Sequence, residues 1–288
     1  MHGSLFLIEN AAHAVPEALA PCAVSIRAEP VGDLGATDAM LVREPKPARL
    51  VRRQIELETA LDSRPTGDLA TLIYLPAGNG TPYELQKRAE LWMASRPDEH
   101  GAAVEVPFRS ERILWRIGRA LVIGRGEYIQ DVQQAVSLFS FCEAQLSTLE
   151  QQIAGQWSTL DADLSLTHSV GRNELAQQAQ IDFRTSAAHR MRIELVRLET
   201  ALERLDAVLS PPAQRIFSEL AVQRDIVDRL RLLDDAIEVA QEVYDTANDR
   251  LTEYRYFHRE YRIEVMITFI LLFELIVMAL EAWRHWHN

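Results

Sequence analysis

The chain has 288 residues, of which 48% are hydrophobic and 25% charged, a composition typical of a globular protein rather than a disordered one. Its net charge of −12 argues against a broad nucleic-acid-binding surface, so no direct nucleic-acid partner is expected. The only cysteines, Cys22 and Cys142, are far apart in sequence. This excludes a disulfide scaffold and any metal site built from clustered cysteines.

Glycine, proline and charge are unevenly distributed along the chain. All 12 glycines lie at or before Gly171, and ten of the 12 prolines lie at or before Pro107. Residues 1–126 carry 15 basic and 16 acidic side chains, whereas residues 127–288 carry 15 and 26. Because long stretches without glycine or proline favour long helices, we expect a mainly α protein with a small α+β domain at residues 1–126.

Short apolar and β-branched runs predict strands in this N-terminal domain. In chain order they cover residues 23–26, 39–42, 69–75, 102–106, 113–117 and 120–123. The last two flank Gly118-Arg119, which predicts a hairpin with a two-residue turn. Thr81-Pro82 opens a predicted helix that extends to Ser95, while residues 48–62 fit either a helix or a strand.

Two glycine-rich turns are the candidate anion sites of the N-terminal domain. Gly78-Asn79-Gly80 lacks the lysine and Ser/Thr of a phosphate-binding P-loop, so we interpret it as a turn. Gly124-Arg125-Gly126 precedes a helix, but a joint between the domain and that helix is the simpler interpretation. The sequence carries no nucleophile elbow, HExxH pair or paired-cysteine spacing. It therefore nominates no catalytic residue, cofactor site or metal site.

Residues 127–262 have the apolar periodicity of long helices. One predicted helix runs from Glu127 to about Leu160, and a second covers residues 173–209. Pro211-Pro212 ends the second helix and starts a third, which is predicted to reach residue 262. Spacings of three and four define a seam on the second and third helices: Ala188, Met191, Leu195, Leu198, Leu202, Leu205 and Leu209, then Ile226, Leu230, Leu233, Ile237, Ala240, Tyr244, Ala247, Leu251 and Tyr254. These seams predict an antiparallel coiled coil across the proline turn.

Residues 263–283 are predicted to form a single transmembrane helix. Residues 265–280 are apolar except for Thr268 and Glu274, and the 21-residue segment is ~31 Å long, about one hydrocarbon thickness. Three arginines precede it and two tryptophans follow it, as at membrane interfaces. The arginine bias predicts a single-pass membrane protein with its N-terminal head on the cytosolic or matrix-equivalent side. A helix buried in a soluble bundle remains the alternative, because a 16-residue run is short for a span.

Acidic residues within this segment are the candidate assembly residues. One face of the helix is defined by three- and four-residue spacing and includes three acids: Glu264, Ile267, Leu271, Glu274, Met278 and Glu281. Since a carboxylate near the bilayer centre must be neutral, paired or facing protein, Glu274 predicts a contact between copies in a homo-oligomer. Arg262, Glu264, Glu274 and Glu281 are therefore the candidate assembly and membrane residues.

Arg262-Ile263-Glu264, followed by Glu274 ten residues after Glu264, resembles the C-terminal signature of the required-for-meiotic-nuclear-division (RMND-type) family. In that family an Arg-Leu-Glu-Trp-type motif opens an apolar segment with an internal acid at this spacing. The resemblance covers residues 127–283 and is that of a divergent member: Val265 stands where the family usually has tryptophan, and residues 1–126 lack the family's aromatic, glycine-rich strands. The resemblance implies membrane association and self-assembly. Mitochondrial members support organellar translation from the inner membrane, and no catalytic residue carries over.

Together these features favour a non-enzymatic, tail-anchored scaffold that contacts membrane lipid, forms a homo-oligomer and binds an unidentified protein through its N-terminal domain. A ligand-sensing head that relays its state through the helices is the alternative, and an enzyme ranks third. A magnesium channel also has a long helix before a C-terminal span. The single span and the lack of a Gly-x-Asn pore motif argue against that class.

Overall fold

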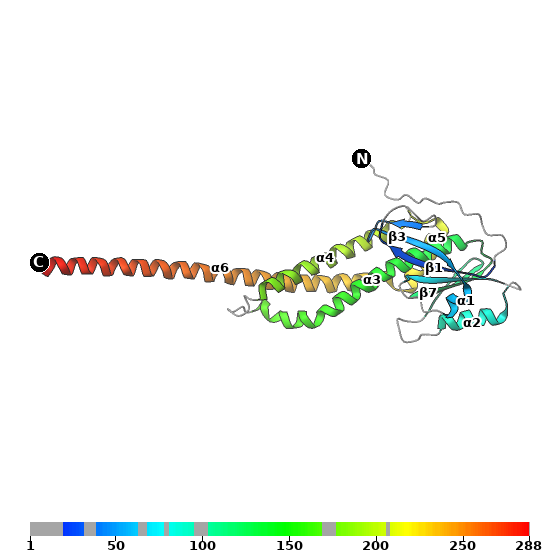
Figure 1. The fold of residues 1–288 in the computed structure, drawn as a ribbon, viewed down its shortest axis with the longest axis horizontal. Coiled ribbons are helices and arrows are strands. Elements are labelled where there is room, and N and C mark those ends of the chain that lie inside the picture. The colour runs from blue at the N-terminus through cyan, green and yellow to red at the C-terminus, as the bar shows by residue number, and fades with distance from the viewer. Residues whose placement is uncertain are drawn as a thin grey trace, which may run out of the picture. The chain divides into compact units, whose positions relative to one another are not determined.

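The computed structural model describes residues 20–31, 39–62, 68–77, 81–94, 103–168, 177–205 and 208–287 (Figure 1). The chain divides into two compact units, which do not follow chain order. The first, called the sheet unit, comprises residues 1–152 and 192–234. The second, called the helical unit, comprises residues 153–191 and 235–288. The candidate glycine turn Gly78-Asn79-Gly80 lies outside the described residues.

Seven strands form one mixed sheet in the sheet unit. They are β1 (Cys22–Glu29), β2 (Ala39–Val42), β3 (Ala48–Ile55), β4 (Ala70–Pro76), β5 (Val104–Phe108), β6 (Glu111–Arg116) and β7 (Gly118–Gly124). Their order is β2-β3-β1-β4-β7-β6-β5, and every neighbouring pair is antiparallel except β4 and β7. The ambiguous segment at residues 48–62 contains both predicted alternatives, because β3 is followed at once by helix α1 (Leu57–Asp62).

The predicted hairpin between β6 and β7 is present, but its turn lies one residue earlier than predicted. Arg116 pairs with Arg119 and Trp115 with Ala120, so the turn residues are Ile117 and Gly118 rather than Gly118 and Arg119. Gly118 has φ 77°, a conformation that glycine adopts without a steric penalty. The position of this positive φ sets the register.

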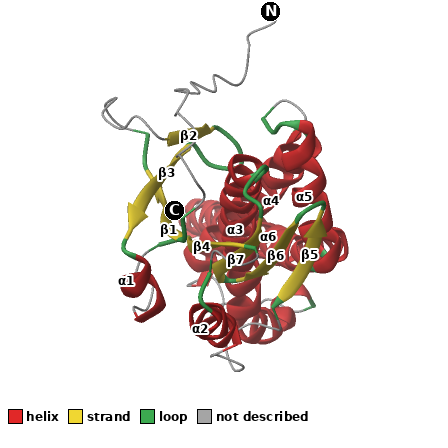
Figure 2. Cartoon of the chain, turned by 90° about the vertical axis from the view of Figure 1, so that its right-hand side faces the viewer, coloured by secondary structure: helices red, strands yellow, loops and turns green. Residues whose placement is uncertain are grey.

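Helices cover both faces of the sheet (Figure 2). Helices α1 and α2 (Tyr83–Ala94) pack on one face around a core that includes Ile73, Leu75, Trp92 and Leu121. On the other face, the rings of Trp115, Phe139 and Phe217 meet edge to face, with centroids 4.8 and 5.4 Å apart. The sheet is therefore buried on both sides, which explains why six consecutive residues of β4 are buried.

Four longer helices follow the sheet: α3 (Ile129–Asp163), α4 (Gln178–Glu203), α5 (Pro211–Gln223) and α6 (Ile226–His287), with a short 3₁₀ helix at Leu164–Thr167 after α3. The prediction of one helix from residue 213 to 262 was wrong at Arg224 and Asp225, which separate α5 from α6. Asp225 has φ 52°, a left-handed conformation that ends a helix and that aspartate tolerates better than most residues. No glycine or proline marks this corner. The predicted start of a helix at Pro211-Pro212 was right, and Ser210 caps it by accepting a hydrogen bond from the Ala213 amide at 3.3 Å.

Most of the predicted seam residues are buried. On α4, Ala188, Met191, Leu195 and Leu198 are at most 4% exposed, while Leu202 and the following Leu205 are half-buried. On α6, the predicted seam from Ile226 to Leu251 is buried, and Tyr254 is half-buried. The apolar periodicity thus identified the core-facing sides of these helices.

The helical unit is joined by polar contacts as well as by apolar packing. Arg184 on α4 forms an ion pair with Asp163 at the end of α3. His189 on α4 contacts α6, with its Nδ1 2.8 Å from the amide nitrogen of Gln241. Near residue 255, the Arg255 guanidinium donates a hydrogen bond to the side chain of Gln178.

Candidate functional site

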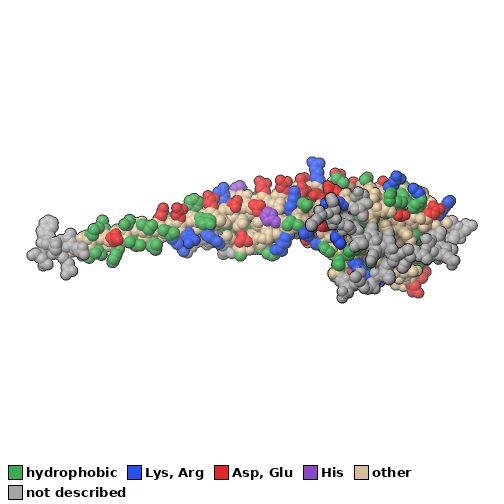
Figure 3. All heavy atoms as spheres, turned by 90° about the horizontal axis from the view of Figure 1, so that it is seen from above, with side chains coloured by type: hydrophobic (Ala, Val, Ile, Leu, Met, Phe, Trp, Pro, Cys, Tyr) green, Lys and Arg blue, Asp and Glu red, His purple; other side chains and the backbone are tan. Residues whose placement is uncertain are grey.

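Residues 265–280 of α6, called the apolar segment, have no covering side chains within the described chain. Val265 is half-buried and every residue from Met266 to Leu280 is exposed. An 18-residue window of this helix has a mean hydropathy of 2.5, and none of that window is buried. By length and composition, α6 is able to cross a membrane. Figure 3 shows apolar side chains along the visible face of this stretch of the helix, with one acidic group among them.

The predicted assembly residues all lie on α6. Arg262, Glu264 and Glu274 are exposed, whereas the side chain of Glu281 lies outside the described ones. At 100° per residue, Glu264 and Glu274 are ~80° apart around the helix, within one face. Arg262 lies ~160° from Glu264, so the basic residue occupies the opposite side. Among the described residues, no hydrogen bond or ion pair involves the side chains of Arg262, Glu264 or Glu274, and the assembly role of all four residues stays a prediction.

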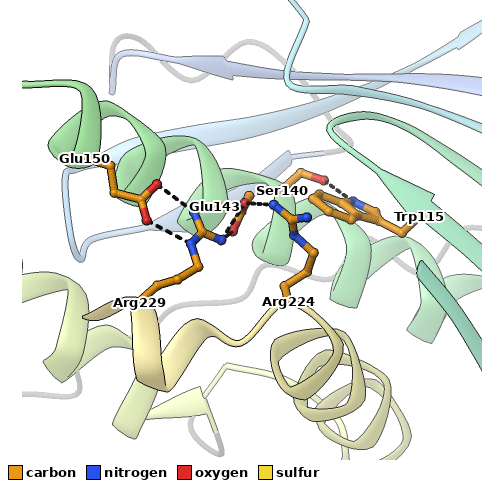
Figure 4. Close-up of polar contacts among 6 residues, drawn as sticks. All are labelled: Trp115, Ser140, Glu143, Glu150, Arg224 and Arg229. Atoms are coloured by element: carbon orange, nitrogen blue, oxygen red, sulfur yellow. Dashed lines mark hydrogen bonds and ion pairs between the residues drawn. The ribbon is translucent and has the colours of Figure 1, made fainter. Parts of the chain in front are cut away.

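A partly buried cluster of two glutamates and two arginines lies in the sheet unit, where the sequence predicted no functional residue (Figure 4). Glu143 on α3 is 2% exposed and accepts hydrogen bonds from Arg224 at 2.9 Å and from Arg229 at 2.8 and 2.9 Å. Arg229, in the first turn of α6, also donates to both oxygens of Glu150 at 2.8 Å. A lone acid in the apolar run Phe139–Leu146 of α3 was the only sequence signal for this cluster.

The charges of this cluster balance within the chain. Burial alone lowers the pKa of the Arg229 guanidinium, but the hydrogen bonds and charges of Glu150 and Glu143 outweigh burial and raise that pKa. The Arg224 guanidinium also lies over the Trp115 ring, 5.7 Å from its centroid, and Trp115 donates a 3.0 Å hydrogen bond to Ser140. Both acids are paired with arginines, and the cluster attaches the α5–α6 corner to α3.

A second buried carboxylate, Glu111 at the start of β6, forms no ion pair within the part of the chain that the structure describes. Its Oε1 accepts a 2.8 Å hydrogen bond from the Gly126 amide, whereas its Oε2 has no hydrogen-bond partner among the described residues. Burial raises the pKa of this carboxyl despite the Gly126 hydrogen bond. Tyr74 donates to the Gly124 carbonyl at 3.0 Å, and burial together with the Glu111 charge raises the pKa of Tyr74 to about 12.

Glu111 explains the glycine at the end of β7. A Cβ on Gly124 would lie 1.8 Å from Glu111 Oε2 and 2.8 Å from the Ser110 carbonyl oxygen. The segment from Gly124 to Gly126 therefore connects β7 to α3, as the sequence indicated, and its Gly126 amide is already bonded to a carboxylate rather than open to an anion.

The described residues show no site for a metal ion or a reactive thiol. They contain no group of three or more His, Cys, Asp or Glu side chains able to hold a metal. Cys142 is buried, and burial raises the pKa of its thiol to about 12, far from the range of a nucleophilic cysteine. An apolar cavity of about 10 Å³ lies beside it, room for one water at most. It is lined by Phe139, Cys142, Leu146, Leu198, Leu202, Phe217 and Ile226.

Comparison with known proteins leaves the family open. No protein-family model matches the chain, and no curated protein is similar to it in sequence. Among solved structures, it is similar to one described as the structure of the full-length CmaX protein, at 12% sequence identity. That match covers 79% of this chain and 81% of the other, with a TM-score of 0.36. A similarity of this size transfers neither activity nor site residues.

Proposed function

We propose that this protein is a non-enzymatic scaffold that is anchored in a membrane by the apolar segment and self-associates there through its helices. The observation that carries the proposal is the exposure of the whole segment from Met266 to Leu280. A continuous apolar surface of this size on one chain indicates a membrane or a protein interface, because water solvates it poorly.

The energetics of insertion support a membrane as the surroundings of this segment. Its eleven Leu, Ile, Val and Phe residues contribute ~0.3–0.6 kcal/mol each, or about 3–7 kcal/mol in favour of insertion. Glu274 opposes insertion by roughly 2.5–3.5 kcal/mol if it lies at the bilayer centre. The balance favours insertion by a small margin, which a partner for Glu274 would increase.

The resemblance to the RMND-type family adds to this proposal. The spacing of Arg262, Glu264 and Glu274 is similar to that family's C-terminal signature, which implies membrane association and self-assembly. We propose that the chain is a divergent relative in which long helices with apolar seams precede a membrane helix. Glu143 and Glu150 both accept hydrogen bonds from Arg229, which supports a structural role for these three charges.

We propose that the sheet unit lies on the cytosolic or matrix-equivalent side of the membrane. Arg255, Arg259 and Arg262 precede the apolar segment and only Arg284 follows it closely, so the positive-inside bias favours this orientation. A reporter fused after Asn288 is expected to be protected from cytosolic protease in intact cells. Cleavage of that reporter from the cytosol would contradict the orientation.

Alkaline extraction of membranes tests the anchor itself. The full chain is expected to stay in the membrane pellet, and Ile270→Arg combined with Leu271→Arg to move it to the soluble fraction. The matched control is Val227→Arg with Leu232→Arg, because these apolar side chains are 77% and 68% exposed on the same helix. The control is expected to stay in the pellet. A wild-type chain that is soluble without detergent would overturn the proposal.

A further inference from the structure

The charged residues of α6 next to the apolar segment form two stripes on opposite sides of the helix. The basic stripe consists of Arg255, Arg259 and Arg262, and the acidic stripe of Glu253, Glu260 and Glu264. At 100° per residue each stripe spans ~40–60°, and their centres are ~150° apart. All six side chains are exposed, and Figure 3 shows basic and acidic groups along opposite edges of the helix beside the apolar side chains.

The stripes lack the pairing that normally stabilises an exposed helix. Glu260 and Glu264 are like charges at i,i+4, and so are Arg255 and Arg259. Such pairs destabilise a helix, whereas opposite charges at these spacings stabilise it. Arg250 and Glu253, one turn earlier, have the usual arrangement, an ion pair of 3.1 Å.

The four stripe residues nearest the apolar segment have no counter-charge within the described chain. Arg255 donates to Gln178 and Glu253 accepts from Arg250, but no hydrogen bond or ion pair among the described residues involves the side chains of Arg259, Arg262, Glu260 or Glu264. The same stretch of α6 therefore exposes a basic side and an acidic side, and both are available to a partner outside the described chain.

We propose that the partner of both stripes is a second copy of the chain, packed parallel and in register. The basic stripe of one α6 then meets the acidic stripe of its neighbour. This inference rests on the proposed membrane anchor, because insertion in one direction keeps neighbouring helices parallel and level. The two stripes occupy the same stretch of helix, so parallel copies bring opposite charges together without any shift along the axis.

The apolar residues between the stripes fit the same packing. Ile263, Ile267 and Ile270 are about half exposed and follow the 4-3 spacing of a helix-pairing seam, which Glu274 continues. Arg259 and Glu264 flank this seam. Arg259 and Glu264 are five residues apart. In a parallel helix pair, a residue beside the seam of one helix lies next to the residue five positions further along on the other helix, so Arg259 of one copy is expected to reach Glu264 of the other. Glu274 thereby faces the second copy rather than lipid.

An anionic lipid surface fits these residues less well. The two stripes contain three arginines and three glutamates, so a negatively charged headgroup layer would attract one stripe and repel the other. A second copy satisfies both stripes at once, which is the complementarity expected of a specific interface.

Charge reversal of each stripe tests the inference in the full chain, purified in mild uncharged detergent. The basic reversal is Arg259→Glu with Arg262→Glu, the acidic reversal is Glu260→Arg with Glu264→Arg, and the charge swap combines all four. We expect each reversal alone to weaken self-association at least tenfold by sizing and cross-linking. The charge swap is expected to restore it, as is mixing the two reversed proteins. Arg231→Glu with Glu238→Arg, exposed charges earlier on α6, is the matched control and is expected to change nothing.

Two further measurements separate this inference from the membrane anchor. Every variant is also assayed for retention in alkali-extracted membranes, and a wild-type chain that is not retained overturns the anchor and this inference together. Retained variants whose self-association is unchanged, or a charge swap as weak as either reversal, overturn the inference and leave the anchor standing. Binding to vesicles with and without 30% phosphatidylserine gives the remaining outcome. A basic reversal that alters vesicle binding and not self-association assigns the stripe to lipid instead of a second copy.

Discussion

The first turn and the middle of α6 carry the same residue types in opposite situations. In its first turn, Arg229 is half-buried and bonded to Glu143 and Glu150 of α3. Beside the apolar segment, Arg259 and Glu264 are exposed and have no ion pair within the described residues. The fold thus supplies partners for the arginine at the start of α6, whereas Arg259 and Glu264 have none among the described residues. Charges without such partners point to contacts outside the chain.

The start of α6 also shows how those internal partners fix a boundary between helices. Arg224 precedes Asp225, whose left-handed conformation separates α5 from α6. Its guanidinium reaches Glu143, and the Arg229 guanidinium reaches the same carboxylate from the other side of the corner. One buried acid thus holds residues on both sides of the turn.

Removing that acid is expected to produce the largest effect. Glu143→Ala leaves two arginines without their shared counter-charge, and breaking a buried ion pair in this way destabilises a protein by about 3–5 kcal/mol. Urea titration of the full chain in mild detergent, followed by tryptophan fluorescence, measures the loss. Glu150→Ala is the matched control: its side chain is 36% exposed, and Arg229 keeps Glu143, so a clearly smaller loss is expected. Equal losses would show that burial does not distinguish the two acids.

The second prediction concerns the apolar packing that supports the same corner. Leu198 on α4 is 1% exposed and lines the small cavity with Phe139 and Phe217. Leu198→Ala enlarges that cavity and is expected to destabilise the chain by about 2–5 kcal/mol in the same titration. Arg197→Ala, at the exposed neighbouring position, is expected to stay within ~0.5 kcal/mol. A large effect at Arg197 would mean that the apolar seam of α4 was misassigned.

Leu198 shows which part of the fold the sequence predicted. Leu198 belongs to a periodic seam, and periodicity identifies the buried face of a helix without knowledge of its neighbours. The sequence also predicted an unbroken helix after Pro211-Pro212, which the structure divides at Arg224 and Asp225. Leu198 shares the small cavity with residues of α3 and α5 and with Ile226, the first residue of the predicted seam on α6. No glycine or proline marks the break at Asp225, and Arg224 and Arg229 on either side of it bond to Glu143, which is distant in sequence.

The third prediction concerns Glu274, whose side chain has no partner among the described residues. Glu274→Gln keeps a hydrogen-bonding group at membrane depth and is expected to preserve the oligomer. Glu274→Leu removes it and is expected to weaken association by ~0.6–2 kcal/mol while improving membrane retention. Native sizing in mild detergent reads both variants. An unchanged oligomer in the leucine variant would remove Glu274 from the interface.

For the candidate site, the sequence predicted the position of the apolar segment but not which charges of α6 lack a partner. Apolar composition and flanking arginines identified the apolar segment, because a membrane-spanning helix is encoded by its own residues. The opposition of the two charged stripes also follows from helix geometry. What the sequence did not show is that Arg259 and Glu264 find no partner elsewhere in the described fold, since this depends on which elements approach α6.

Glu111 differs from Glu143, because it is a buried acid without an ion pair among the described residues. Burial raises the pKa of its carboxyl above the ordinary value of 4.5. Below pH 4.5 the carboxyl is protonated in both the folded and the unfolded chain, and its contribution to stability is complete. As the pH rises above 4.5, the unfolded chain ionises first, so the folded state loses stability until the raised pKa is passed.

The free energy of unfolding of the wild type, relative to Glu111→Gln, is therefore expected to fall as the pH rises above 4.5. Glu105 provides a control of opposite sign, because a hydrogen bond from Arg112 lowers the pKa of its carboxyl. Relative to Glu105→Gln, the wild type is expected to hold its stability above pH 4.5 and to lose it as the pH falls below that value. Urea titrations at half-unit pH intervals compare the slopes. Parallel pH profiles for the wild type and Glu111→Gln would mean that Glu111 ionises as freely in the folded chain as in the unfolded one.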